Sequence, residues 1–132
     1  MKILITILIT LCLNSILGQS NNNIKTIQVI FEEYTKYEES TDSQENKDKI
    51  LKSLNSISKT EDPNDLELLI NVWMYYDPTD FPTRDYVYKI LKSSKPESIE
   101  AIKCRIKNKK TWEKDNRAPY SELKELIKEL EK

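Results

Sequence analysis

The sequence predicts an all-α protein of about six short helices. Apolar residues recur at steps of three and four along most of the chain, which is the period of one helix face. Gly18 is the only glycine, whereas tight hairpins between strands prefer turns that contain glycine. Prolines that follow a capping residue separate the apolar segments instead. The expected architecture is an α-solenoid-like array of helical hairpins or a compact irregular bundle.

The N-terminal segment has the anatomy of a secretory signal peptide. A positive start at Lys2 precedes an apolar run over residues 3–13, which is too short to span a bilayer. We expect residues 1–18 to be the signal peptide, with cleavage after the small residue Gly18. A lipid anchor on Cys12 is the alternative, but Leu11 stands where a small residue is needed. The remainder, residues 19–132, is expected to be a single all-α domain in a secreted or periplasmic location.

The first helix is expected to begin near Ile24, after three asparagines that can cap it, and to continue through Tyr37. A polar connection without apolar residues follows. The second helix is expected over about 44–58, where the apolar positions are Ile50, Leu51, Leu54 and Ile57.

The third helix is expected over 63–76, because Asp62 can cap it and Pro63 fits the first helical position. Nine of the eleven residues in 66–76 are apolar, which predicts a central helix with neighbours on more than one side. Trp73 and Tyr76 are expected in the core. Asp77 precedes a proline and should end this helix, and the fourth helix is expected over about 83–92.

The fifth helix is expected to open with a capping box formed by Ser94 and Glu97. Its inner stripe should consist of Ile99, Ile102 and Ile106. Cys104 is expected to be a small buried apolar side chain rather than half of an intermolecular bridge. The sixth helix is expected to start at residues 118–119, with Leu123, Leu126, Ile127 and Leu130 facing inward.

The helices that begin at Pro63 and Pro96 start 33 residues apart. Successive helix-loop-helix units of this length, over residues 62–132, resemble α-solenoid repeats of the HEAT or TPR type. The resemblance implies a protein that binds other proteins through a curved face.

The composition removes several function classes. The chain has no histidine, and after processing it would have no glycine, so phosphate-binding loops, nucleophile elbows, His-based catalytic pairs and imidazole metal ligands are missing. We therefore expect no enzyme and no cofactor. The formal net charge of −1 implies no polyelectrolyte partner. Acidic residues nevertheless predominate over 31–85 and basic residues over 86–132.

The first candidate site is an aromatic and acidic ridge within residues 73–88. Tyrosines beside charged residues are the favoured chemistry of protein-binding hot spots. The alternatives are an aromatic core with capping aspartates, or aspartates that bind a metal or act in a carboxylate-based hydrolase. The partner-binding residues expected here are Tyr75, Asp77, Asp80, Phe81, Arg84, Asp85 and Tyr88.

The second candidate site is a basic face on the fifth helix. Lysines follow one another at steps of four, three and four, with a tryptophan as an interfacial anchor and Arg105 widening the patch. An anionic membrane surface or an acidic protein fits this face, whereas export argues against nucleic acid. A solvated helix face is the alternative. The residues are Lys103, Lys107, Lys110, Trp112 and Lys114.

The sequence as a whole predicts a small exported, non-enzymatic module that binds another protein, such as a periplasmic inhibitor or immunity-type protein. The alternatives are an envelope protein held on anionic membranes by the basic helix, and a carboxylate-based hydrolase. The identity of the partner and the oligomeric state are not encoded in any motif of the chain.

Overall fold

The computed structural model of the chain describes residues 22–36, 43–76, 81–108 and 118–132, without the side chains of residues 81, 118 and 119. These ranges contain six helices and no strand, which confirms the predicted all-α class. The chain divides between Ile57 and Ser58 into two compact units, and each is described by itself. The single domain expected over 19–132 stays a prediction.

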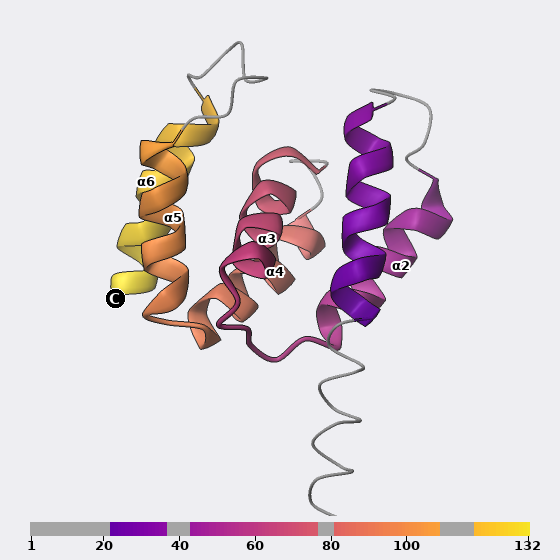
Figure 1. The fold of residues 1–132 in the computed structure, drawn as a ribbon, viewed down its shortest axis with the longest axis horizontal. Coiled ribbons are helices and arrows are strands. Elements are labelled where there is room, and N and C mark those ends of the chain that lie inside the picture. Colours follow the sequence, from indigo (N-terminus) through magenta and orange to yellow (C-terminus); the bar gives the residue numbers. More distant parts are fainter. Residues whose placement is uncertain (1–21, 37–42, 77–80, 109–117) are drawn as a thin grey trace, which may run out of the picture. The chain divides into compact units, whose positions relative to one another are not determined.

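The first unit contains the helix over 22–36 and helix α2 (Gln44–Asn55) (Figure 1). Ser43 caps α2, because its hydroxyl accepts the N–H of Asn46 at 3.2 Å. The helix ends at Asn55 rather than Ser58, since the next two N–H groups bond back over three residues and tighten the last turn. The buried apolar residues of this unit are Ile24, Ile27, Ile30, Phe31, Ile50, Leu54 and Ile57.

The second unit contains α3 (Pro63–Tyr75), α4 (Phe81–Ser93), α5 (Glu97–Lys107) and α6 (Ala118–Glu131). Helix α3 packs against α4 and α5, and α5 also packs against α4 and α6. Figure 1 shows α5 and α6 side by side, next to the pair formed by α3 and α4. The central position predicted for α3 is confirmed by its buried residues, Leu66, Leu69, Ile70, Val72 and Met74, and by Tyr76 at its C-cap.

The N-terminus of α3 is built as the sequence predicts. The Asp62 carboxylate accepts the N–H groups of Asn64 at 2.8 Å and Asp65 at 3.2 Å, and Pro63 occupies the first turn. Two of the four donors left open at a helix start are thereby satisfied. Residue types alone fix this end of the helix.

The expected capping box at the start of α5 is wrong. The Ser94 hydroxyl donates to the Ile90 carbonyl at 2.7 Å and accepts the Thr60 N–H at 3.0 Å, so it ties the loop before α3 to the end of α4. Helix α5 starts at Glu97 with no side-chain cap. Ser98, which is fully buried, donates instead to the Leu91 carbonyl at 2.6 Å.

The expected inner stripe of α5 is also shifted. The buried positions are Ser98, Ile102 and Arg105, whereas Ile99 and Ile106 are half-buried. This rotation places Arg105 between α3 and α6, where it finds hydrogen-bond partners. The apolar period therefore located the helix and its buried Ile102, but it missed Ser98 and Arg105 on the inner face.

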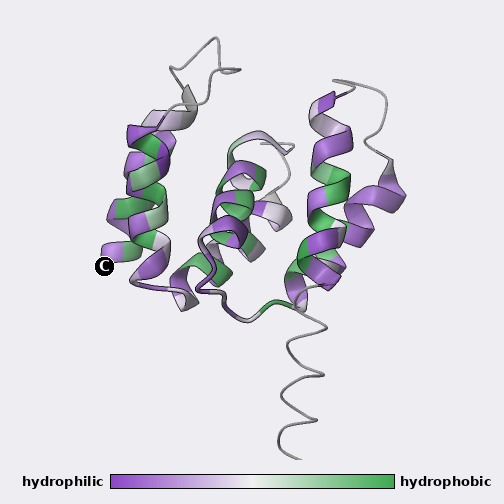
Figure 2. Cartoon of the chain, in the orientation of Figure 1, coloured by the Kyte–Doolittle hydropathy of each residue, from purple (hydrophilic) through white to green (hydrophobic). Residues whose placement is uncertain are grey.

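Helix α6 has the predicted inward residues, with Ile127 half-buried at the edge. Figure 2 shows hydrophobic and hydrophilic positions interleaved along the helices, as amphipathic packing requires. None of the helices in the described ranges has both the length and the apolar character needed to cross a membrane. The buried apolar residues of α6 are Tyr120, Leu123, Leu126 and Leu130.

Candidate functional site

Arg105 is part of the scaffold rather than of an exposed basic patch, which corrects its expected role. Its Nε donates to Asn71 Oδ1 on α3 at 3.0 Å, and its Nη1 donates to the Tyr120 hydroxyl on α6 at 2.7 Å. Only 3% of the residue is exposed. A buried guanidinium is tolerated when its donors are satisfied in this way, so Arg105 joins three helices.

A groove of about 500 Å³ runs along α4 and α6, with the indole of Trp73 from α3 on its lining. We call it the α4/α6 groove. The groove brings together Arg84, Asp85 and Tyr88 of the predicted ridge with residues of α6 that the sequence analysis did not link to them. The groove is lined by Trp73, Arg84, Asp85, Tyr88, Ser121, Glu122, Glu125, Leu126 and Glu129.

Two residues of this groove, Trp73 and Arg84, form a cation–π pair. The guanidinium carbon of Arg84 lies 4.3 Å from the centroid of the Trp73 ring, within the range of a cation–π contact. Arg84 Nη2 also pairs with Glu122 Oε2 at 2.9 Å. Trp73 is expected in the core, but it is half-buried and lines the groove, with Arg84 over its ring.

The charge of the α4/α6 groove is negative. Four carboxylates line it against the single guanidinium of Arg84, which Glu122 already neutralises. Lysines at the outer edge screen part of this charge: Lys128 pairs with Glu125 at 2.7 Å. The hydrogen bond from Lys132 to Glu129, together with the Glu129 charge, raises the pKa of the Lys132 ammonium. Asp85 is exposed and has no ion-pair partner within the described part of the chain.

Three residues of the predicted ridge, Arg84, Asp85 and Tyr88, lie together in the groove. Tyr75 is half-buried near the end of α3 and does not line it. Phe81 begins α4, but its side chain lies outside the described residues, as do Asp77 and Asp80.

The predicted basic face is described only in part. Lys103 and Lys107 are exposed on α5, one turn apart, and Lys103 lies 3.6 Å from the Glu100 carboxylate. The remaining members, Lys110, Trp112 and Lys114, lie outside the described residues.

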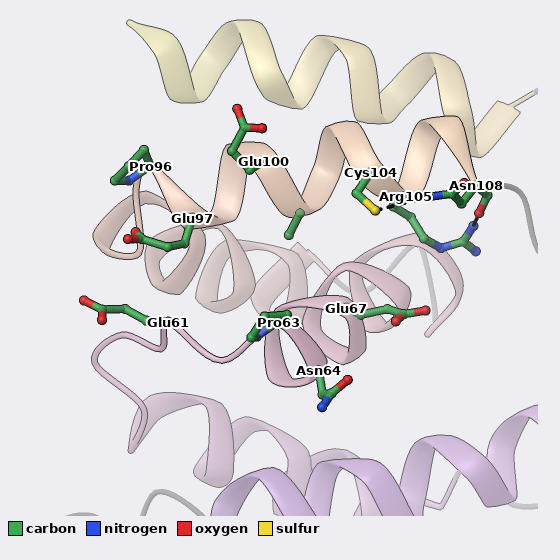
Figure 3. Close-up of a pocket in the computed structure, with 11 residues that line it drawn as sticks. Glu61, Pro63, Asn64, Glu67, Pro96, Glu97, Glu100, Cys104, Arg105 and Asn108 are labelled. Atoms are coloured by element: carbon green, nitrogen blue, oxygen red, sulfur yellow. Dashed lines mark hydrogen bonds between the residues drawn. The ribbon is translucent and has the colours of Figure 1, made fainter.

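A second groove, of about 720 Å³, lies between α3 and α5 (Figure 3), and we call it the α3/α5 groove. Cys104 lies on its lining and is exposed, so the expected buried thiol is wrong. The reason is the rotation of α5, which places residue 104 outside the buried stripe. The Asn108 amide donates to the Cys104 sulfur at 3.3 Å. The lining residues are Glu61, Pro63, Asn64, Glu67, Pro96, Glu97, Glu100, Ala101, Cys104, Arg105 and Asn108.

The residues that sequence reasoning missed are the acidic ones on α6. Glu122, Glu125 and Glu129 follow one another at steps of three and four, the same period that identified the apolar stripe of this helix. That period places them on one face. Which residues of α4 lie opposite these glutamates depends on how α4 and α6 pack in the folded protein.

Comparisons with known proteins assign this chain to no family, so its fold class is the only classification that the structure supports. No family model matches the chain, no curated protein aligns with it, and no solved structure matches it. The molecule is thus an all-α protein with two acidic grooves on its second unit. The resemblance of residues 62–132 to helical repeats stays a prediction.

Proposed function

We propose that the chain is a small exported module without catalytic activity that binds another protein through the α4/α6 groove. The observation that carries this proposal is the half-buried Trp73 with the Arg84 guanidinium over its ring, because both residues line the groove. Trp, Tyr and Arg are the residues enriched at binding hot spots. Here Tyr88 supplies the third of these residue types.

The charge of the groove defines the chemistry of the partner. Carboxylates on both walls favour a segment with lysine or arginine side chains beside an apolar residue that reaches Trp73 and Leu126. Complementary charge accelerates encounter and excludes acidic partners. The partner is therefore a protein with a basic, partly apolar surface, and an inhibitor or immunity-type role in a secreted or periplasmic setting fits a module of this size.

Two charge reversals on α6 test the proposal. Glu125→Lys reverses an exposed carboxylate in the groove, and Glu131→Lys makes the same change at an exposed position outside it. We expect immobilised wild-type protein to recover one envelope protein from the source cells saturably, Glu131→Lys to recover it equally, and Glu125→Lys to weaken binding roughly tenfold. Recovery of no saturable protein, or equal recovery by both variants, would refute the proposal.

A second candidate is attachment to an anionic membrane surface by α5. It rests on the two exposed lysines, Lys103 and Lys107, one turn apart on that helix. Liposome co-sedimentation separates the two functions, because attachment to anionic vesicles must disappear at high salt. A chain that ignores anionic vesicles at low salt would eliminate this candidate.

A further inference from the structure

The lining of the α3/α5 groove combines the small apolar residues Pro63 and Ala101 with polar Asn64, Glu100 and Cys104. Ala101 lies between Glu97 and Asn108 on the α5 part of the lining, Pro63 lines the groove from the start of α3, and Figure 3 shows Pro96 near one end. The small side chain of Ala101 leaves room for a close approach of backbone. This surface shares no residue with the α4/α6 groove.

The two ends of the α3/α5 groove are acidic. Figure 3 shows Glu61 and Glu97 near Pro96 at one end, and Glu67 near Arg105 and Asn108 at the other. The only cation on the lining is Arg105, whose donors are already bonded to Asn71 and Tyr120. Lys59 lies 3.8 Å from Glu61, but both side chains are well exposed and such a pair is weak.

These carboxylates are separated along the groove rather than convergent. Within the described ranges, no three acidic or thiol side chains come together as a metal ion would require. On α5 the lining extends from Glu97 to Asn108, about 16 Å at the rise of an α-helix. A ligand that meets carboxylates at both ends of the groove, and Pro63 and Ala101 between them, must be elongated.

We infer that the α3/α5 groove holds a basic amphipathic helix of about three turns from a partner protein. Its apolar side chains lie over Ala101 and Pro63, and its lysine or arginine side chains reach Glu61 and Glu97 at one end and Glu67 at the other. A helix fits because α5 lines the groove along its whole length and the first turns of α3, from Pro63 to Glu67, line the opposite side. A third helix packs into such a groove by its side-chain ridges. This site is separate from the one in the proposed function, and either can fail alone.

Cys104 reports occupancy of this groove directly. It is exposed on the lining next to Arg105, so a helix seated there covers the sulfur. Alkylation by iodoacetamide depends on access to the thiol. Mass spectrometry of the fragment that contains Cys104 distinguishes it from Cys12.

The probe is a 14-residue peptide with leucine and lysine at helical spacing. Its controls are the same peptide with glutamate in place of lysine and a scrambled order of the same residues. With the full chain at low salt, we expect saturable binding of the lysine peptide only, and a roughly tenfold slower alkylation of Cys104 at saturation, because the helix blocks access. Binding that leaves the alkylation rate unchanged, or no binding, would overturn the inference.

Paired charge reversals assign the groove. Glu61→Lys/Glu97→Lys alters the α3/α5 groove, and Glu125→Lys/Glu129→Lys makes the matched change in the α4/α6 groove. Protection of Cys104 from alkylation reports peptide binding in the α3/α5 groove alone. We expect the first variant to weaken this binding roughly tenfold, because the new lysines repel the lysines of the peptide, and the second variant to leave the protection of Cys104 unchanged. Equal weakening by both, or weakening by the second alone, would reject the α3/α5 groove as the site. Thermal unfolding by circular dichroism verifies that both variants are folded; Ala101→Arg, which fills the groove, replaces the first if it is not.

Discussion

Two arginines of the second unit each lie over an aromatic ring, but they differ in burial and in how many of their donors are bonded. Arg105 lies against the Tyr120 ring, 5.6 Å from its centroid, and is hydrogen-bonded to side chains of two other helices. Arg84 lies over the Trp73 ring, 20% of its side chain is exposed, and its buried Nε has no partner among the described residues. A charge whose donors are satisfied from several elements holds a scaffold together. A charge that is only partly satisfied, beside a half-buried ring on a groove lining, suits recognition.

The largest expected effect is on the Arg105 junction. Arg105→Ala should lower the free energy of unfolding by about 3 kcal/mol, because it leaves a cavity and two buried polar groups, Asn71 Oδ1 and the Tyr120 hydroxyl, without this partner. Urea unfolding followed by circular dichroism measures the loss. Lys103→Ala, an exposed change on the same helix, should cost no more than about 0.5 kcal/mol. If Arg105→Ala and Lys103→Ala lost equal stability, Arg105 would not be the scaffold residue that its buried hydrogen bonds indicate.

A smaller effect is expected at Arg84. Arg84→Ala should cost about 1 kcal/mol, because a partly exposed ion pair and one cation–π contact are lost. A double-mutant cycle with Glu122→Ala should give a coupling energy of about 0.5 kcal/mol that declines in high salt. If Arg84→Ala destabilised the fold as much as Arg105→Ala, the groove would have to be regarded as scaffold.

The smallest expected effect concerns the partly buried carboxylate of Asp65. Burial raises the pKa of Asp65 above its ordinary value of 3.8; a hydrogen bond from Thr60 at 3.1 Å opposes this rise, and the Asp62 charge adds to it. The folded state therefore binds this proton more tightly than the unfolded state. As the pH falls through the folded pKa toward 3.8, protonation of Asp65 should increase the free energy of unfolding, so the folded state becomes more stable.

Asp65→Asn isolates this contribution. The variant should lack the part of the pH dependence that lies just above pH 3.8, as measured by urea unfolding at closely spaced pH values. Glu131→Gln, at an exposed position near the chain end, is the matched control and should leave the profile unchanged. A wild-type contribution that weakened as the pH fell in this window would contradict the direction of the pKa shift.

Local chemistry explains the parts of the fold that the sequence predicts. Asp62 and Pro63 determine the start of α3 through residues adjacent in sequence, and the dense apolar run that follows determines its central position. The inner face of α5 depends instead on distant partners. Asn71 and Tyr120 lie 34 and 15 residues from Arg105, and without them a charged residue is reasonably assigned to the surface.

The same distinction applies to the candidate site. The composition of α4 predicts Arg84, Asp85 and Tyr88 as partner-binding residues, and all three line the α4/α6 groove. Helix periodicity also places the glutamates of α6 on one face, but only the packed fold brings that face to α4. Trp73 was assigned to the core because an aromatic residue at helical spacing usually packs inward.

The buried guanidinium of Arg105 affects how the second unit opens locally. Because it bonds α3 and α6 from α5, none of these helices can detach there without breaking hydrogen bonds that water reaches poorly. At the other end of α6, Lys95 Nζ donates to the Leu130 carbonyl at 2.8 Å. Amide protons on α3, α5 and α6 should therefore exchange with deuterium as one cooperative block, at a single opening free energy.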